Sequence, residues 1–226
     1  GLKDPLIFGT LTFDDAPRPK KRKKYNYAVL TSSTGARLQI FDKVELLAFG
    51  ETIPGIDLFP SVQDWKWFER TSLFTRGTAF QNFEVPRDGA AARLLPMICY
   101  EDIIPMFVRK MWQEGGPADA LVNVTNDSWY GDTHEPLIHL VLATFRSIET
   151  RRALIRSTNT GISAFVSPTG KIVKRTGQWT RETLVHDVPL ITDGESTLFL
   201  KFGNWRGYVL LLITLALVVR GRSQGR

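Results

Sequence analysis

The single cysteine of the chain, Cys99, is the side chain best suited to covalent chemistry. It ends the apolar run 93–99 and is followed by Tyr100, Glu101 and Asp102. A nucleophile at a strand end projects from a rigid support, and neighbouring backbone amides can face a developing oxyanion. Free cysteines are among the most buried residues, so the thiol alone favours a structural role. The acidic pair directly after it shifts the interpretation towards catalysis.

Lys43 is the candidate cation for ionising this thiol. A thiol becomes a strong nucleophile when it loses its proton, and a nearby positive charge lowers its pKa. Lys43 stands at the end of a predicted strand and opens a loop, 43–55, that contains Gly and Pro. Taken singly, Lys43, Glu51 and Glu101 are typical of solvated surface charges, so composition and spacing alone do not assign them to a site.

The segments that would position these residues predict an α/β domain. Pro136 opens a run with apolar residues at helical spacing, which predicts a helix up to Arg152. Strands with a helix between them are typical of a layered α/β fold. Short apolar or alternating runs bounded by polar loops predict the strands, at 6–11, 25–30, 37–41, 93–99, 120–124, 153–156, 162–166 and 171–173.

Composition restricts the class of protein. The 226 residues are 43% hydrophobic, which is enough for one domain with a substantial core. The net charge of +6 is concentrated in the segment 18–24 and in a tail with Arg220, Arg222 and Arg226. No basic face is spread over the domain, so we expect no nucleic-acid partner. A single cysteine excludes an intramolecular disulfide and a cysteine-rich metal site, and we expect no metal or cofactor.

The two ends of the chain carry different signals. Residues 1–5 show no secretory signal, and the chain enters a predicted strand at once, which indicates a fragment of a longer protein. Residues 207–219 are apolar and uncharged, with Trp205 and Tyr208 as interfacial anchors. We expect a transmembrane helix at 205–220, although this run is shorter than the roughly 20 residues usually needed and a buried core helix is the alternative. The predicted parts are a catalytic domain (1–200), this helix, and a basic tail (221–226).

Several segments are similar, in order, to motifs of one family. They are Phe41–Pro54 around Lys43, Ile98–Glu101 around Cys99, Thr125–Gly131, Arg151–Ser163, and Gly203-Asn204-Trp205 before the apolar run. Together they cover nearly the whole chain. On these motifs the chain resembles the apolipoprotein N-acyltransferases, a membrane-bound branch of the nitrilase (carbon–nitrogen hydrolase) superfamily.

The resemblance implies a nitrilase-like α-β-β-α sandwich and a Glu-Lys-Cys triad. Cys99 would be the nucleophile and Lys43 the triad lysine, which stabilises charge on the thiolate and on tetrahedral intermediates. Glu51 would be a second acidic residue of the catalytic site. The implied substrate-binding residues are Tyr100 and Glu101, which shape the site, and Trp129 and Tyr130, on the aromatic side of an acyl-chain pocket.

The sequence departs from the family at the triad glutamate. In the family this general base lies N-terminal to the lysine segment, in a Pro-Glu context. No acid in that context precedes Lys43, where the acids are Asp4, Asp14, Asp15 and Asp42. We therefore expect the general base to lie outside these residues, and the fragment to be inactive or very weak.

The implied reaction is ping-pong acyl transfer. Cys99 would take a fatty acyl chain from a phospholipid as a thioester and pass it to the amino group of a diacylglyceryl-cysteine lipoprotein. The aromatic stretch 57–76, with Trp65 and Trp67, would be a helix or lid suited to a lipid substrate. The arginines after residue 219 place the tail in the cytoplasm by the positive-inside tendency, and the catalytic domain on the periplasmic side of a bacterial inner membrane.

Three alternatives stay open. A soluble nitrilase-like amidase would use Lys43 and Cys99 on a small carbon–nitrogen substrate. A Cys-His hydrolase would use His134, His139 or His186, whose placement fits chance better. A non-enzymatic scaffold would use the basic run 20–24 as an anionic-lipid patch, although such runs are usually solvated loops.

Overall fold

The helices and strands of the computed structural model extend over the described residues, which are 4–13, 23–56, 58–59, 61 and 73–224. Short 3₁₀ helices follow two of the strands, η4 (Cys99–Ile103) and η5 (Ser128–Tyr130). The α-helices are α1 (Pro105–Gly115), α2 (Glu135–Thr150), α3 (Leu198–Phe202) and α4 (Trp205–Gln224). The strands are β1 (Leu6–Phe13), β2 (Lys24–Thr31), β3 (Arg37–Asp42), β4 (Phe83–Val85), β5 (Ala92–Ile98), β6 (Ala120–Asn126), β7 (Leu154–Asn159), β8 (Ala164–Val166) and β9 (Ile172–Arg175).

The strands form two sheets. The first is antiparallel with the order β1-β2-β3, so that β1 is an edge strand. The second has six strands in sequence order, β4 to β9. Its centre, β5-β6-β7, is parallel, and its other pairs are antiparallel. Parallel neighbours need crossover connections, and α1 and α2 supply them.

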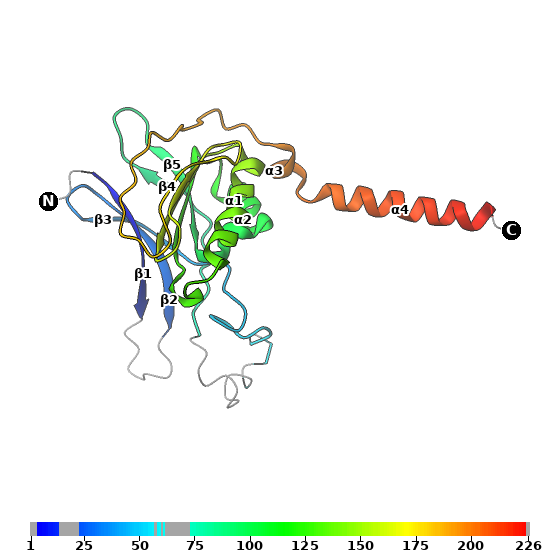
Figure 1. Cartoon of the computed structure of the whole chain (residues 1–226), viewed down its shortest axis with the longest axis horizontal. Coiled ribbons are helices and arrows are strands. Elements are labelled where there is room, and N and C mark those ends of the chain that lie inside the picture. Colours follow the sequence, from blue (N-terminus) through cyan, green and yellow to red (C-terminus); the bar gives the residue numbers. More distant parts are fainter. Residues whose placement is uncertain (1–3, 14–22, 57, 60, 62–72, 225–226) are drawn as a thin grey trace.

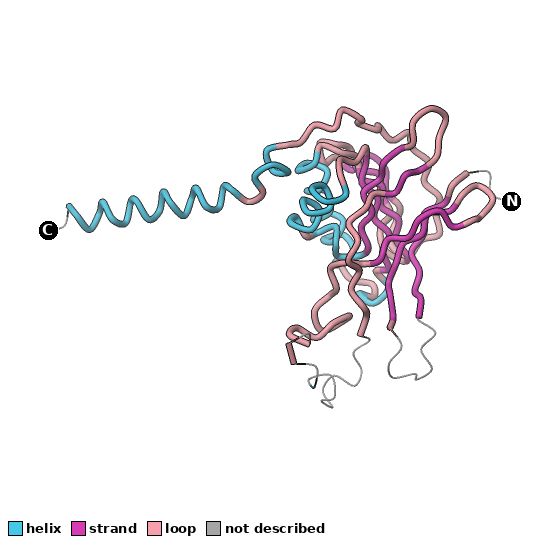
Figure 2. The backbone as a smooth tube through the Cα atoms, turned by 180° about the vertical axis from the view of Figure 1, so that it is seen from behind, coloured by secondary structure: helices cyan, strands magenta, loops and turns pink. Residues whose placement is uncertain are grey.

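The sheets and helices are stacked in layers. Helices α1 and α2 cover one face of the six-stranded sheet, and the three-stranded sheet lies on the other side (Figure 1). The view from behind shows the same order (Figure 2). Three layers of the expected α-β-β-α sandwich are therefore present. No described helix covers the outer face of the three-stranded sheet in either view.

The apolar runs explain the central strands. β5 and β6 are buried along almost their whole length, because helices cover one face and the second sheet the other. Each expected strand and the expected helix at 136–152 is present, with ends displaced by a few residues. Helix α1 was not expected. Its signal was Pro105 at the first turn followed by the buried residues Phe107, Val108, Met111 and Trp112.

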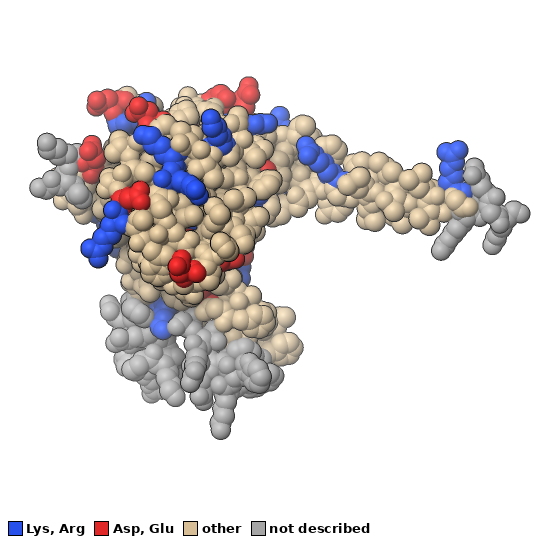
Figure 3. Space-filling model, viewed as in Figure 1, with Lys and Arg blue, Asp and Glu red and all other residues tan. Residues whose placement is uncertain are grey.

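The apolar C-terminal run is helical. Helix α4 extends away from the domain, and its side chains from Tyr208 to Val219 are exposed where they are large and apolar (Figure 1). Figure 3 shows this helix as an uncharged rod with basic side chains near its ends. Among the described residues no helix combines the length and the apolarity that crossing a bilayer needs. The transmembrane assignment of 205–220 is thus not confirmed.

Two segments singled out in the sequence fall outside the described residues. They are most of the basic run, at 18–22, and most of the aromatic stretch, at 62–72, including Trp65 and Trp67.

Candidate active site

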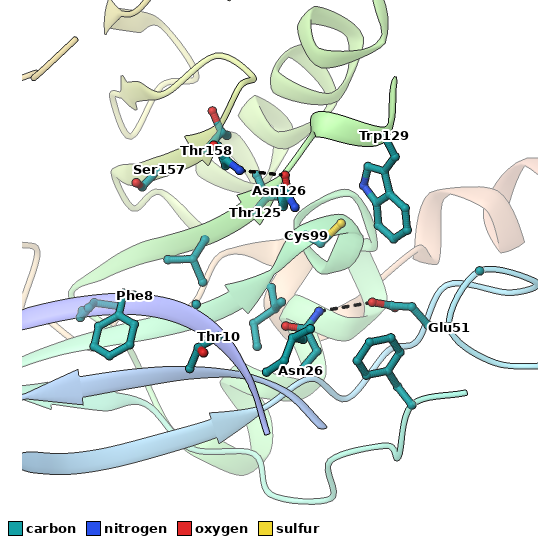
Figure 4. Close-up of a pocket in the computed structure, with 18 residues that line it drawn as sticks. Phe8, Thr10, Asn26, Glu51, Cys99, Thr125, Asn126, Trp129, Ser157 and Thr158 are labelled. Atoms are coloured by element: carbon teal, nitrogen blue, oxygen red, sulfur yellow. Dashed lines mark hydrogen bonds between the residues drawn. The ribbon is translucent and has the colours of Figure 1, made fainter. Parts of the chain in front are cut away.

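A pocket of about 800 Å³ is lined by both sheets and has Cys99 in its wall (Figure 4). Residues 7–11 of the edge strand β1 form one side. The opposite side comes from the carboxyl ends of β5, β6 and β7, which the parallel pairing brings to one edge of the sheet. Ligand sites commonly lie at this edge of parallel sheets.

Cys99 begins η4 directly after β5, in a strained turn. Its φ of 54° lies in the left-handed region, which costs an L-residue about 1–2 kcal/mol. Asn123 holds the turn from the neighbouring strand, since its Nδ2 donates to the carbonyl of Cys99 at 3.1 Å. Strained backbone persists only where the surroundings fix it, and such sites are often functional. The side chain is only 4% exposed, and its sulfur faces the pocket (Figure 4).

Lys43 and Glu51 form a buried ion pair beside this turn. The Nζ of Lys43 donates to Oε2 of Glu51 at 2.6 Å, and the two side chains are 1% and 2% exposed. The same oxygen accepts from the amide of Leu47 at 2.9 Å, and Oε1 accepts from Nδ2 of Asn26 at 3.3 Å. The loop 44–51 thereby brings an acid eight residues away back onto the lysine. Neither Lys43 nor Glu51 is therefore the solvated surface charge that composition and spacing alone suggest.

Opposing effects act on the thiol of Cys99. Burial raises its pKa, and the charge of Glu51 acts in the same direction. The ammonium of Lys43 lowers the pKa, as do hydrogen bonds with the Thr125 side chain and the Tyr100 backbone. The net pKa is raised, so the resting state is the thiol. Lys43 is the cation that favours the thiolate once the proton leaves.

Glu101 joins the lysine loop to the cysteine turn. Its Oε1 accepts hydrogen bonds from the amides of Val44 at 2.7 Å and Glu45 at 2.9 Å, while Oε2 accepts from the amide of Ile98 at 2.7 Å. The side chain is fully buried, and burial raises its pKa to about 8 against the opposing effect of these amides. Glu101 therefore fixes the two candidate catalytic residues relative to each other and does not line the pocket.

The aromatic residues separate into two roles. Trp129 lines the pocket and is 57% exposed. Tyr130 instead packs edge-on against Tyr100, at 6.1 Å between ring centroids. The hydroxyl of Tyr100 donates to Glu135 at 2.8 Å, and its burial together with these contacts raises its pKa. The structure thus places Trp129 at the pocket, whereas Tyr100 and Tyr130 are not among its lining residues.

The sequence does not predict the buried polar cluster under the cysteine turn as a unit, although Asp102 and His139 were each singled out. The cluster consists of Asp102, Asp127, His139 and Arg156, all with fully buried side chains. Asn123, which belongs to a run of apolar residues, is bound to Arg156 and was the one detectable signal.

The geometry does not favour a Cys-His pair. Both ring nitrogens of His139 are engaged, with Asp102 at 2.8 Å and with Asp127 at 3.2 Å. His186 packs against Phe165, and His134 precedes α2. Within the part of the chain that the structure describes, no histidine lines the pocket.

The proton acceptor for the thiol is not evident among the described residues. Glu51 is the carboxylate that lines the pocket there, and it is bound to Lys43. Within the same residues no group of three or more His, Cys, Asp or Glu side chains is placed to hold a metal ion.

Comparison with known proteins shows two levels of similarity. The carbon–nitrogen hydrolase family matches residues 5–194 of this chain. An apolipoprotein N-acyltransferase of Bdellovibrio bacteriovorus is 35% identical over 230 aligned residues, which include 100% of this chain and 41% of the relative. Apolipoprotein N-acyltransferase 2 of Leptospira interrogans is 33% identical, with 89% of this chain and 40% of the relative aligned. The chain therefore spans about two fifths of these curated relatives.

Solved structures share the fold at low sequence identity. A carbon–nitrogen hydrolase from Helicobacter pylori superposes with a TM-score of 0.54 and 16% identity, over 80% of this chain and 60% of that one. An amidase of the nitrilase superfamily from Nesterenkonia gives a TM-score of 0.50 with 19% identity, over 77% of this chain and 57% of that one. At this identity the likeness establishes the fold only.

Proposed function

Because the chain belongs to the carbon–nitrogen hydrolase family, we propose that it carries the nucleophile of an N-acyltransferase that modifies lipoproteins. The observation that carries the proposal is the setting of Cys99. It stands in a strained turn on a pocket wall, next to a buried lysine whose charge favours its thiolate. Similarity to apolipoprotein N-acyltransferases over the whole chain supports this choice of acyl-transfer reaction.

The first half-reaction forms a thioester. The thiolate of Cys99 attacks the carbonyl carbon of a phospholipid ester, and the C–O bond breaks to release a lysophospholipid, whose alkoxide takes up a proton. Negative charge that develops on the carbonyl oxygen is stabilised by nearby donors, and Lys43 is the cation closest to this role. The acceptor of the thiol proton is not assigned to a described residue.

The second half-reaction regenerates the thiolate. The amino group of a diacylglyceryl-cysteine at the N-terminus of a lipoprotein attacks the thioester carbon. The C–S bond breaks, an amide forms, and the amine loses its proton. Buried Glu101 would keep the Lys43 loop and the Cys99 turn in register through both half-reactions.

The pocket suits an acyl chain. Its volume of about 800 Å³ is in the range of small-molecule sites, and apolar side chains from β1 and β6 face it. Ile7, Phe8 and Leu11 come from β1, Val124 comes from β6, and Trp129 comes from η5. These residues would hold the chain while the thioester carbon lies at Cys99.

A membrane location fits the exposed apolar surface. Helix α4 presents large apolar side chains along its length, and the loop residues Phe49, Leu58 and Phe59 are more than half exposed. We propose that these segments contact the bilayer of a bacterial inner membrane. If the C-terminal segment crosses that membrane, the arginines at 220 and 222 face the cytoplasm and the domain lies on the periplasmic side.

Mass spectrometry of the peptide that contains Cys99 tests the proposal. The full-length protein is incubated with phospholipid vesicles, and the Cys99 peptide is examined for an acyl adduct. We expect the adduct in the natural sequence and its loss in Cys99→Ala. An adduct elsewhere that survives Cys99→Ala would reject Cys99 as the nucleophile.

A small-molecule amidase is the second candidate, and its support is the match of residues 5–194 to the carbon–nitrogen hydrolase family. It would use the same thiol without a lipid. Turnover of short amides at a rate that lipid vesicles do not affect, without acylation of Cys99 by phospholipid, would favour this reaction.

A further inference from the structure

Four charged or ionisable side chains lie under the cysteine turn, and each comes from a different element. Asp102 belongs to η4, Asp127 follows β6, His139 lies on α2, and Arg156 lies on β7. All four side chains are fully buried. None of them lines the pocket, so direct contact with a substrate does not explain them.

Arg156 binds both carboxylates at once. Its Nη1 forms an ion pair with Asp102 and donates to Oδ1 of Asn123 at 3.0 Å. Its Nη2 donates to Oδ2 of Asp127 at 3.2 Å. The planar fork of a guanidinium makes this double contact, which a lysine ammonium cannot reproduce in the same geometry. β7 is thereby joined to the turn after β5 and to the loop after β6.

His139 makes the same connection from the helical layer. Its Nε2 is 2.8 Å from Oδ1 of Asp102. Its Nδ1 lies 3.2 Å from Oδ1 of Asp127 and 2.9 Å from Nη2 of Arg156. The ring stacks on Tyr100, with 4.7 Å between centroids and 12° between planes.

Charge within the cluster favours a cationic His139. Burial by itself lowers its pKa, but the hydrogen bond and charge of Asp102, with help from Asp127, outweigh burial and raise it. The charge of Arg156 acts in the opposite direction and lowers the pKa of His139. Arg146, which lies on α2 as His139 does, also interacts with the charge of Asp102. The two carboxylates thus raise the pKa of His139, and Arg156 places a guanidinium between them.

Three contacts lead from the cluster to Cys99. Asp102 lies in the same 3₁₀ turn. Asn123, bound to Arg156, donates to the carbonyl of Cys99. Thr125 donates to Asp127 at 3.3 Å and also hydrogen-bonds with the thiol. The carbonyl of Cys99 is therefore held by Asn123 and its sulfur by Thr125, each of which is bound to a member of the cluster. The ring of the next residue, Tyr100, stacks on His139.

We propose that the Asp102–Asp127–His139–Arg156 cluster is a positioning device that holds the Cys99 turn in its strained conformation, with the sulfur directed towards Lys43 and the pocket. The inference rests on the proposed role of Cys99 as nucleophile. Buried ion pairs are weak contributors to stability compared with apolar packing, so fixing one conformation is the role that accounts for their presence. His139 and Arg156 are positioning residues and do not touch the reacting atoms.

The test is the pH profile for alkylation of Cys99 by iodoacetamide in the purified protein. Because the chain has one cysteine, the reaction reports on this thiol alone. Arg156→Lys keeps the charge and removes the fork, and His139→Gln keeps one donor and removes the second contact. We expect the midpoint of the profile to rise by about one pH unit in each variant, which is about tenfold less thiolate at neutral pH.

Arg152→Lys is the matched control. Arg152 is also a buried arginine, but it binds the carbonyl of Ala118 and the carboxylate of Asp193, away from Cys99. Its replacement should lower thermal stability and leave the alkylation midpoint unchanged. All profiles are measured well below the unfolding temperature of each variant, which separates loss of positioning from loss of the fold.

The outcomes separate this inference from the proposed function. Unchanged midpoints in Arg156→Lys and His139→Gln, or an equal rise in Arg152→Lys, would overturn the positioning role even where phospholipid acylates Cys99. Raised midpoints confined to the two cluster variants would support it even where no acyl adduct forms.

Discussion

The ammonium of Lys43 and the carboxylate of Glu51 meet at 2.6 Å in a place that solvent does not reach. An isolated buried charge is costly, and a close partner with further hydrogen bonds offsets that cost. Glu51 obtains these bonds from Asn26 and from the amide of Leu47. The pair thus keeps a positive charge inside the domain, where it acts on the thiol of Cys99.

Replacing Lys43 should affect both activity and stability. We expect Lys43→Met to slow acyl transfer in the full-length protein by on the order of 10²–10³, the typical cost of losing one electrostatic stabiliser. Breaking the pair also leaves Glu51 as an unpaired buried charge, which should destabilise the fold by about 3–5 kcal/mol. Acylation rates and urea unfolding measure the two effects separately.

A double variant distinguishes catalysis from folding. Lys43→Met with Glu51→Gln removes both charges, so most of the lost stability should return while the rate stays low. The exposed Lys110→Met serves as a surface control, with no expected change in either measurement. If the acylation rate of the double variant recovered together with its stability, the role of Lys43 would be purely structural.

Glu101 should be sensitive to loss of its second carboxylate oxygen. Glu101→Gln keeps the shape but turns an NH₂ group towards one of three backbone donors, and this should cost about 1–3 kcal/mol. Glu45→Gln, at a partly exposed neighbour, should stay within about 0.5 kcal/mol of the natural protein. Urea unfolding curves provide the comparison, and equal effects of the two substitutions would contradict the buried connection.

The cost of Glu101→Gln should also depend on pH. Folded Glu101 keeps its proton up to a pKa of about 8, whereas the ordinary value is 4.5. Between these values the folded state binds more protons than the unfolded chain. The contribution of Glu101 to the free energy of unfolding therefore falls as pH rises, by up to about 1.4 kcal/mol per pH unit. Glutamine does not titrate. Over three pH units this loss exceeds the substitution's cost of about 1–3 kcal/mol, so the advantage of the natural protein at pH 5 should fall and reverse by pH 8. A constant difference would argue against the raised pKa.

The strained backbone of Cys99 predicts an unusual order of stability. Glycine adopts a positive φ without steric cost, so Cys99→Gly should be more stable than Cys99→Ala by about 1 kcal/mol. Neither variant can form the acyl adduct. Ala120→Gly, in the neighbouring strand β6, is the control and should lose about 0.5–1 kcal/mol. Greater stability of Cys99→Ala would show that the turn is not strained.

Much of the fold could be predicted from the sequence because its central strands are apolar runs that read clearly against polar loops. Residues 93–99 and 120–124 lie in or at the ends of β5 and β6, as expected. The pairing of Lys43 with Glu51 could not be predicted in this way, because it depends on how the loop 44–51 folds back. The roles assigned to these residues remain proposals.

The buried cluster was beyond sequence reasoning for a related reason. Its members lie up to 54 positions apart in the sequence. Each is of a charged or polar residue type that is usually found at the surface. Only tertiary structure brings them together. Helix α1 was missed although Pro105 and its apolar spacing were visible. The membrane helix expected at 205–220 is not confirmed, because no described helix is both long and apolar enough to cross a bilayer.

The last prediction concerns the apolar surface of α4. Leu211 and Leu215 are each more than half exposed on this helix, which extends away from the domain (Figure 1). If α4 contacts a bilayer, Leu211→Lys with Leu215→Lys should weaken binding to vesicles by about tenfold or more, because charged side chains are unfavourable within the apolar region of a bilayer. Vesicles of zwitterionic phosphatidylcholine, which has no net charge, are used so that added lysines gain no attraction to anionic lipid. Sedimentation with the vesicles measures the bound fraction.

The matched control places the same two charges on the domain. Leu38 on β3 and Val173 on β9 are 44% and 41% exposed, and both lie apart from α4 in the fold. Leu38→Lys with Val173→Lys changes the net charge equally, so it should leave vesicle binding within about twofold of the natural protein if insertion of α4 drives the association. Equal loss in both double variants would mean that the whole domain surface mediates binding. No loss in either would mean that α4 is not the segment that contacts the bilayer, and the location proposed for this chain would then need a different anchor.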